Sequence, residues 1–135
     1  MSPLPFICDY TDYPLIPIKF FYKSKETPVI DALLDSGGDF IVIPMAIALY
    51  LKLKLERAGQ VDTAGGAAEL YKAYVDMDML DETGKISYKN LEIHVSPRND
   101  IPVLLGRCPI FEDHEIVFKK YENHVILYQM NKNEQ

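Results

Sequence analysis

The sequence is poor in cysteine, in positive charge and in long apolar runs, and each shortage excludes a class of protein. Its two cysteines, Cys8 and Cys108, lie far apart and form no C-x-x-C pair. Two thiols cannot supply the disulfide framework of a small secreted domain, so we expect a reduced intracellular protein. The chain also lacks metal-ligand spacing, since its histidines (His94, His114 and His124) are scattered. We therefore expect no metal and no cofactor.

Positive charge is in the minority, with 14 Lys and Arg against 20 Asp and Glu and a formal net charge of −6. Sequence-independent binding of nucleic acid needs clustered cations, so neither nucleic acid nor an anionic membrane surface is an expected partner. No apolar run reaches the length of a membrane span. Residues 1–5 also lack the basic start of a signal peptide. These features together predict a cytoplasmic protein.

Short strands dominate the sequence, which has 135 residues and 48% apolar side chains, enough for the core of one domain. Strands are expected at 15–22, 29–34, 40–43, 56–63, 68–79, 86–95, 102–105, 115–119 and 125–129. Helices are expected only over 45–51, after Pro44, and around 109–113. This pattern predicts an all-β, closed or partly open barrel over residues 15–130. Residues 1–14 are interpreted as an N-terminal arm and candidate dimer contact, and residues 131–135 as a disordered tail.

The segment LLDSGGD at residues 33–39 carries the most chemical information. An apolar strand there delivers the carboxylate of Asp35 directly into a Gly-Gly turn, and charged groups are rarely buried without a partner. Asp35 could simply cap a turn. It could instead belong to a carboxyl pair, in which two close acids share one proton and activate a water molecule.

Only one such motif occurs in the chain. Asp62-Thr63-Ala64-Gly65 looks similar, but its glycine comes one residue late and no apolar strand precedes it. The chemistry of a carboxyl pair therefore predicts that the second acid is Asp35 of another copy, in a symmetric homodimer with the site on the two-fold axis. A serine nucleophile at position 36 is disfavoured, because the chain has no G-x-S-x-G sequence around it.

Three segments, in this order, resemble the retropepsin-like (retroviral-type) aspartic proteases, including their single-domain prokaryotic members. LLDSGGD is similar to the family's hydrophobic-hydrophobic-Asp-Thr/Ser-Gly-Ala motif, with Gly38 in place of the usual alanine. TAGG at 63–66 stands where the family has a glycine-rich flap, and VLLGR at 103–107 is similar to its hydrophobic-hydrophobic-Gly-Arg motif. The resemblance spans about residues 15–129 and implies a barrel of the acid-protease type.

The resemblance also implies roles for individual residues. Asp35, Ser36 and Gly37 would form the catalytic group, with the Ser36 hydroxyl bonding across the two-fold axis. Substrate would contact Gly38, Asp39, the flap residues Ala64, Gly65 and Gly66, and the apolar Val103 and Leu104. Gly106 and Arg107 would be structural, Arg107 being paired with Asp39. The implied activity is hydrolysis of a peptide or protein by water activated between two Asp35 carboxylates.

Other interpretations of the same residues stay open. A dimer with this fold could be catalytically idle and act as a peptide- or partner-binding module. The barrel could also be a structural part of a larger complex, contacted through residues 1–14. Arg107 could be an ordinary surface charge, and Gly65-Gly66 a plain hairpin turn.

Overall fold

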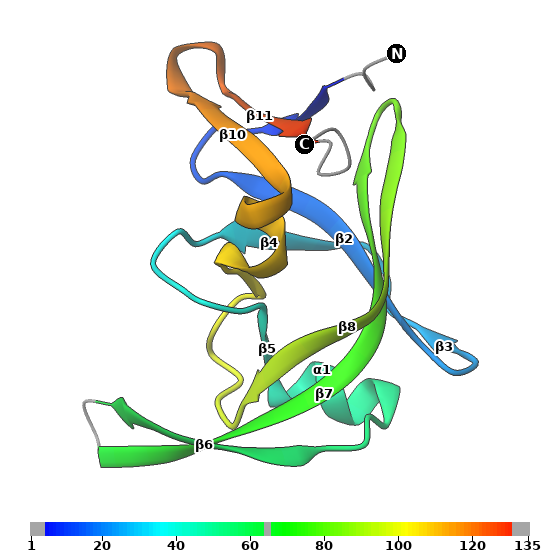
Figure 1. The fold of residues 1–135 in the computed structure, drawn as a ribbon, viewed down its shortest axis with the longest axis vertical. Helices are drawn as coiled ribbons and strands as arrows, with labels where there is room; N and C mark the ends of the chain where they lie inside the picture. The colour runs from blue at the N-terminus through cyan, green and yellow to red at the C-terminus, as the bar shows by residue number, and fades with distance from the viewer. Residues whose placement is uncertain (1–4, 64–65, 131–135) are drawn as a thin grey trace.

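A computed structural model describes residues 5–63 and 66–130 and shows a chain built mainly of strands (Figure 1). The elements are β1 (Phe6–Asp9), β2 (Leu15–Tyr22), β3 (Lys25–Glu26), β4 (Ile30–Leu34), β5 (Val42–Pro44), α1 (Met45–Leu51), β6 (Glu56–Thr63), β7 (Gly66–Asp81), β8 (Gly84–Ser96), β9 (Leu104–Leu105), η1 (Arg107–Phe111), β10 (His114–Lys119), η2 (Lys120–Glu122) and β11 (His124–Gln129). Within these ranges, no helix has the length and apolar character needed to cross a membrane.

The larger sheet closes on itself. Its strand order is β3-β2-β4-β9-β5-β8-β7-β6, and β2 also pairs with β7. The strands from β2 through β4, β9, β5 and β8 to β7 therefore form a ring, with β3 and β6 outside it. This arrangement confirms the all-β barrel expected from the strand pattern.

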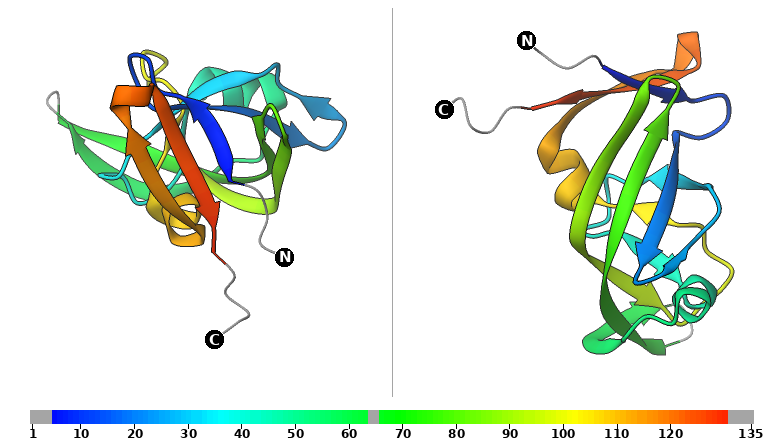
Figure 2. Two further views of the ribbon diagram at one scale, coloured as in Figure 1. Left: turned by 90° about the horizontal axis from the view of Figure 1, so that it is seen from above. Right: turned by 90° about the vertical axis from the view of Figure 1, so that its right-hand side faces the viewer.

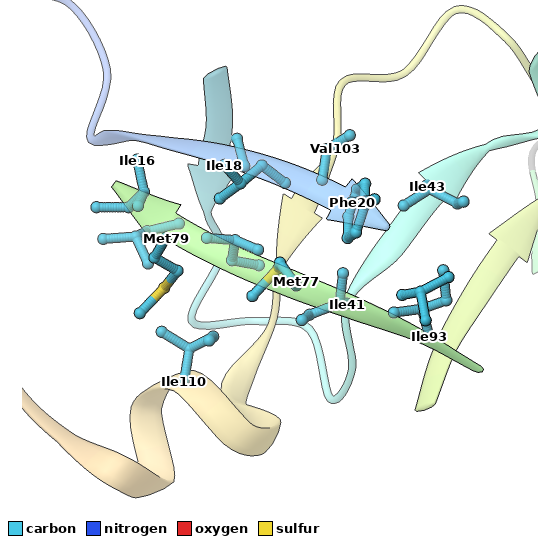
Figure 3. Close-up of a cluster of buried hydrophobic side chains, with 14 of the residues drawn as sticks. Ile16, Ile18, Phe20, Ile41, Ile43, Met77, Met79, Ile93, Val103 and Ile110 are labelled. Atoms are coloured by element: carbon cyan, nitrogen blue, oxygen red, sulfur yellow. The ribbon is translucent and has the colours of Figure 1, made fainter. Parts of the chain in front are cut away.

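The barrel interior is filled by side chains at alternate positions of its strands. On β2, Ile16, Ile18 and Phe20 are fully buried. On the paired strand β7, Met77 and Met79 are buried beside them (Figure 3). Successive side chains of a strand point to opposite faces, so this spacing of two directs one face of each strand inward. Burying such a side chain stabilises the fold by about 1.5–3 kcal/mol. Further buried core residues include Ile41, Ile43, Ile93, Val103 and Ile110.

A second, three-stranded antiparallel sheet has the order β1-β11-β10 and crosses one end of the barrel (Figures 1 and 2). The hairpin of β10 and β11 was expected. The strand β1 was not, because it lies within the segment interpreted as an arm. Phe6 and Cys8 of β1 are buried and lie opposite Leu127 and Val125 of β11. Residues 131–135, the expected tail, lie outside the described residues.

Most expected elements begin one or two residues away from their expected starts, and two of them bear on the site. The strand expected at 40–43 is β5, which begins at Val42, because the preceding loop is bonded through Gly38 and Asp39 to the segment after β9. The helix expected around 109–113 is η1, which begins at Arg107. The helix α1 has the expected bounds, and it is capped by Lys52, whose φ of 56° lies in the left-handed region.

Candidate active site

Asp35 is positioned by β4, the strand that precedes it, and by β9, which lies beside β4. The two strands run parallel, with Leu33 opposite Leu104 and Leu34 opposite Leu105. The Asp35 amide donates to the Leu105 carbonyl oxygen at 2.9 Å. This places the acid where β4 leaves the sheet, with its backbone fixed on β9.

The carboxylate of Asp35 is held by its own turn. The Gly37 amide donates to Asp35 Oδ1 at 3.1 Å, and the Gly38 amide donates to the Asp35 carbonyl oxygen at 3.2 Å. A Cβ on Gly38 would lie 3.1 Å from Asp35 Oδ2, so the glycine leaves that oxygen uncrowded. Asp35 is half-buried, whereas Ser36 is exposed. Among the described residues the Ser36 hydroxyl makes no hydrogen bond, so it can serve a group outside this chain.

The segment of Gly106 and Arg107 is bonded to the later part of the same loop, at Gly38 and Asp39. The Arg107 amide donates to the Gly38 carbonyl oxygen at 2.9 Å, and Arg107 Nε approaches the same oxygen at 3.3 Å. The Arg107 guanidinium pairs with the Asp39 carboxylate. The pairing implied by the family resemblance is therefore present in the structure. Because both side chains are more than half exposed, the pair orients the loop more than it stabilises the fold.

Strands β6 and β7 form a long hairpin that reaches beyond the barrel (Figure 1). The register shifts between Arg57 and Gly59, and Gly59 has a φ of 125°, which marks a bulge in β6. Glu69 accepts a hydrogen bond across the hairpin from Arg57, and another from the Tyr71 hydroxyl of its own strand at 2.8 Å. Gly66 begins β7, whereas Ala64 and Gly65 lie outside the described residues.

A family model described as aspartyl protease matches residues 22–107, a span that contains the Asp35 loop, the β6–β7 hairpin and the Gly106-Arg107 segment. The chain belongs to the aspartyl protease family. No curated protein sequence is similar enough to count as a match. The expected membership in an aspartic protease family is thus confirmed by a match over most of the barrel.

Two solved protease structures share the fold over most of this chain. The retropepsin-like aspartic protease from Rickettsia conorii superposes with a TM-score of 0.68 at 17% identity, covering 93% of this chain and 100% of that one. EIAV protease in complex with an inhibitor superposes with a TM-score of 0.53 at 18% identity, covering 75% of this chain and 88% of that one. At these identities the likeness concerns the fold, which is therefore the acid-protease barrel.

The remaining chemistry-bearing residues of the chain are dispersed. His94 packs against Phe40, with ring centroids 4.4 Å apart, and His114 is buried against the Ile110 carbonyl oxygen. Over the part of the chain that the structure describes, no group of His, Cys, Asp or Glu could hold a metal ion. The contact of His94 with Phe40, a neighbour of the Asp35 loop, was missed by sequence reasoning. No local motif signals it, since it joins β8 to the loop through the tertiary fold.

Proposed function

We propose that this protease is a homodimeric aspartic endopeptidase in which Asp35 of each copy supplies one of two carboxyls. One carboxylate accepts a proton from the attacking water, and the other carboxylic acid donates a proton to the scissile carbonyl oxygen. The tetrahedral intermediate then collapses, the peptide C–N bond breaks and the leaving nitrogen takes up a proton. No covalent enzyme intermediate and no cofactor enters this scheme.

The observation that carries the proposal is the setting of one acid at the end of β4. Asp35 Oδ1 accepts a single amide hydrogen bond, from Gly37. The acid is half-buried at the start of a hydrogen-bonded loop, and the chain has only one D-S-G sequence. A pair of such acids requires a second copy, related by a two-fold axis that passes between the two loops.

The neighbouring residues are assigned supporting roles in this proposal. The Ser36 hydroxyl would bond across the axis and hold the two loops together. The tip of the β6–β7 hairpin, including Ala64, Gly65 and Gly66, would act as a flap that covers bound peptide and excludes water. Gly38, Asp39, Val103 and Leu104 would contact the substrate (Asp39 while paired with Arg107).

The first test is cleavage of an unstructured protein between about pH 4 and 6, where a carboxyl pair sharing one proton is competent. Asp35→Asn should abolish cleavage while the fold is retained. Asp12→Asn is the matched control, because Asp12 is an exposed acid in the loop between β1 and β2. Equal cleavage by the wild-type and Asp35→Asn proteins would refute the assignment.

A mixing experiment tests whether the site is shared. Adding an excess of Asp35→Asn protein to a fixed amount of wild type should reduce activity, since mixed dimers carry only one carboxyl. Adding Asp12→Asn protein instead should raise activity. If excess Asp35→Asn protein has no effect after subunits have had time to exchange, each chain works alone.

A catalytically idle dimer is the alternative to be separated from this enzyme. A peptide-like inhibitor that mimics the tetrahedral intermediate should bind saturably to the wild type and weakly to Asp35→Asn. Strong binding by both proteins, with no cleavage by either, would favour a binding module with the same fold.

A further inference from the structure

A groove separate from the Asp35 loop lies between the barrel and the three-stranded sheet. It has a volume of about 750 Å³, and it is lined by Ile7, Cys8, Asp9, Leu15, Pro17, Val29, Asp31, Leu80, Asp81, Glu82, Thr83 and His124. The β7–β8 turn forms one wall and rises beside β1 (Figure 1). The size is that of a ligand site, and neither the Asp35 loop nor the Gly106-Arg107 segment contributes to it.

The floor of the groove is apolar and open to solvent. Leu15 and Pro17 of β2 and Leu80 of β7 are half-buried there. Ile7 and Val29 keep 43% and 57% of their surface exposed, and both line this same groove. Covering these side chains would release water from apolar surface and so favour a bound apolar group.

The rim of the groove carries several acids, and its one basic side chain is that of His124. Four carboxylates line it (those of Asp9, Asp31, Asp81 and Glu82), and no Lys or Arg does. In the described part of the chain none of these four forms an ion pair with Lys or Arg. By contrast, strand acids elsewhere on the barrel do, as in the pairs Asp76–Lys89 and Asp78–Lys85.

The Asp81 carboxylate joins two segments that line the groove. Its Oδ2 accepts the Ile7 amide at 3.0 Å, and its Oδ1 accepts the Thr83 and Gly84 amides at 2.8 Å and 3.0 Å. These bonds tie the β7–β8 turn to β1. Asp31 on β4 and exposed Glu82 on the turn make no hydrogen bond or ion pair within the described ranges, so their carboxylates can receive a ligand's donors.

We propose that this groove docks an extended polypeptide segment in which apolar residues alternate with Lys or Arg. Charge complementarity indicates the occupant. Because the acids lie on β1, on β4 and on the β7–β8 turn, a single cation cannot contact all of them. Cations spaced along an extended peptide can contact them, and the apolar residues between these cations cover the apolar floor of the groove. The site is independent of peptide cleavage and adds a second binding surface to the molecule.

The test uses the full chain carrying Asp35→Asn, so that a bound peptide is not cleaved, and a fluorescent peptide of alternating lysine and leucine. In this background, Asp31→Asn with Glu82→Gln should weaken binding roughly fivefold, as expected for two exposed charge contacts. Val29→Ser, at an exposed floor position, should weaken it as well. The matched control is Glu115→Gln with Glu122→Gln, two exposed acids on β10 and η2 that remove the same charge and should leave the Kd within about twofold.

Peptide variants and mapping complete the design. A peptide with glutamate in place of lysine should not bind, and one with serine in place of leucine should bind more weakly. NMR shifts caused by the lysine-leucine peptide should centre on residues 7–9, 15–17, 29–31, 80–83 and 124. Equal loss of affinity in the groove and control variants, tight binding of the glutamate peptide, or shifts centred on the Asp35 loop would each overturn the proposal.

Discussion

Gly106 lies directly against the backbone of Phe40. A Cβ at position 106 would stand 2.3 Å from the Phe40 carbonyl oxygen and 2.8 Å from the Phe40 amide nitrogen. No real Cβ approaches backbone atoms so closely. The glycine therefore lets the chain leaving β9 pass beneath the loop that carries Asp35, and this contact explains why a glycine is needed two positions after Leu104.

Replacing this glycine should damage the fold. Gly106→Ala is expected to lower the free energy of unfolding by about 2–3 kcal/mol, because backbone atoms must move apart to admit a methyl group. Gly37→Ala is the control, since a Cβ there would lie 3.4 Å from Asp35 Oδ1, an ordinary contact, and should cost less than about 1 kcal/mol. Urea unfolding measures the free energy of unfolding of both variants, and an equal decrease in the two would contradict the packing argument.

Arg107 should matter more to activity than to stability. The guanidinium pairs with exposed Asp39 and also approaches the Gly38 carbonyl oxygen. Arg107→Lys keeps the charge but loses this forked geometry, so unfolding should change by less than about 1 kcal/mol. If the proposed activity is present, kcat should fall, because the loop next to Asp35 is less well held. A stability loss as large as that of Gly106→Ala would show that the pair is instead a main support of the fold.

Asp81 should give the fold a dependence on pH. Burial opposes ionisation of this carboxyl, but hydrogen bonds from Thr83, Ile7 and Gly84 outweigh it and lower the pKa. A lowered folded-state pKa means that the contribution is complete above the ordinary carboxyl pKa of about 3.9 and is lost as pH falls through the folded-state value.

Asp81→Asn should therefore lower the free energy of unfolding by about 1–2 kcal/mol at neutral pH. Its deficit relative to wild type should shrink in acid. Urea titrations at neutral pH and near pH 3 measure both values, with Asp12→Asn as the neutral control. A deficit that stays constant in acid would mean that the ionised carboxylate is not what stabilises the turn.

Both thiols should react slowly in the folded protein. Burial, with the charges of Asp81 and Asp9, raises the pKa of Cys8 to about 12. A hydrogen bond to Glu112, followed by burial and nearby acids, raises the pKa of Cys108 to about 11. Since the thiolate is the reactive form, alkylation at mildly alkaline pH should be much slower than in urea. Glu112→Gln should speed alkylation of Cys108 and leave Cys8 unchanged, as peptide mass mapping would show.

Much of the fold could be predicted from local pattern. The alternation of Ile16, Ile18 and Phe20 predicted β2 with its observed bounds, because a strand in a barrel buries every second residue. Pro44 followed by good helix formers predicted α1, also with its observed bounds. These elements are specified by their own residues, so a window of sequence contains the information.

Other features escaped prediction because they depend on distant segments. Strand β1 is a strand because β11 lies beside it, and its four residues (Phe6–Asp9) carry too weak a pattern to reveal this. The start of β5 was misplaced because Gly38 and Asp39 bond to the chain after Gly106, which is remote in sequence. The groove likewise combines residues from β1, β2, β4, β11 and the β7–β8 turn, and no motif marks it.

The sequence by itself determined which groups the protein has available: a lone acid at the end of an apolar strand, the glycines that follow it, and an arginine after a second apolar run. Those choices are local, because strand alternation, turn chemistry and motif order are written in neighbouring residues. Only the tertiary structure decided that β9 would lie between β4 and β5 and bring Arg107 onto Asp39. The physical reason is that barrel closure satisfies the backbone hydrogen bonds of β4, β5 and β9 together, and the energy of that closure belongs to no single segment.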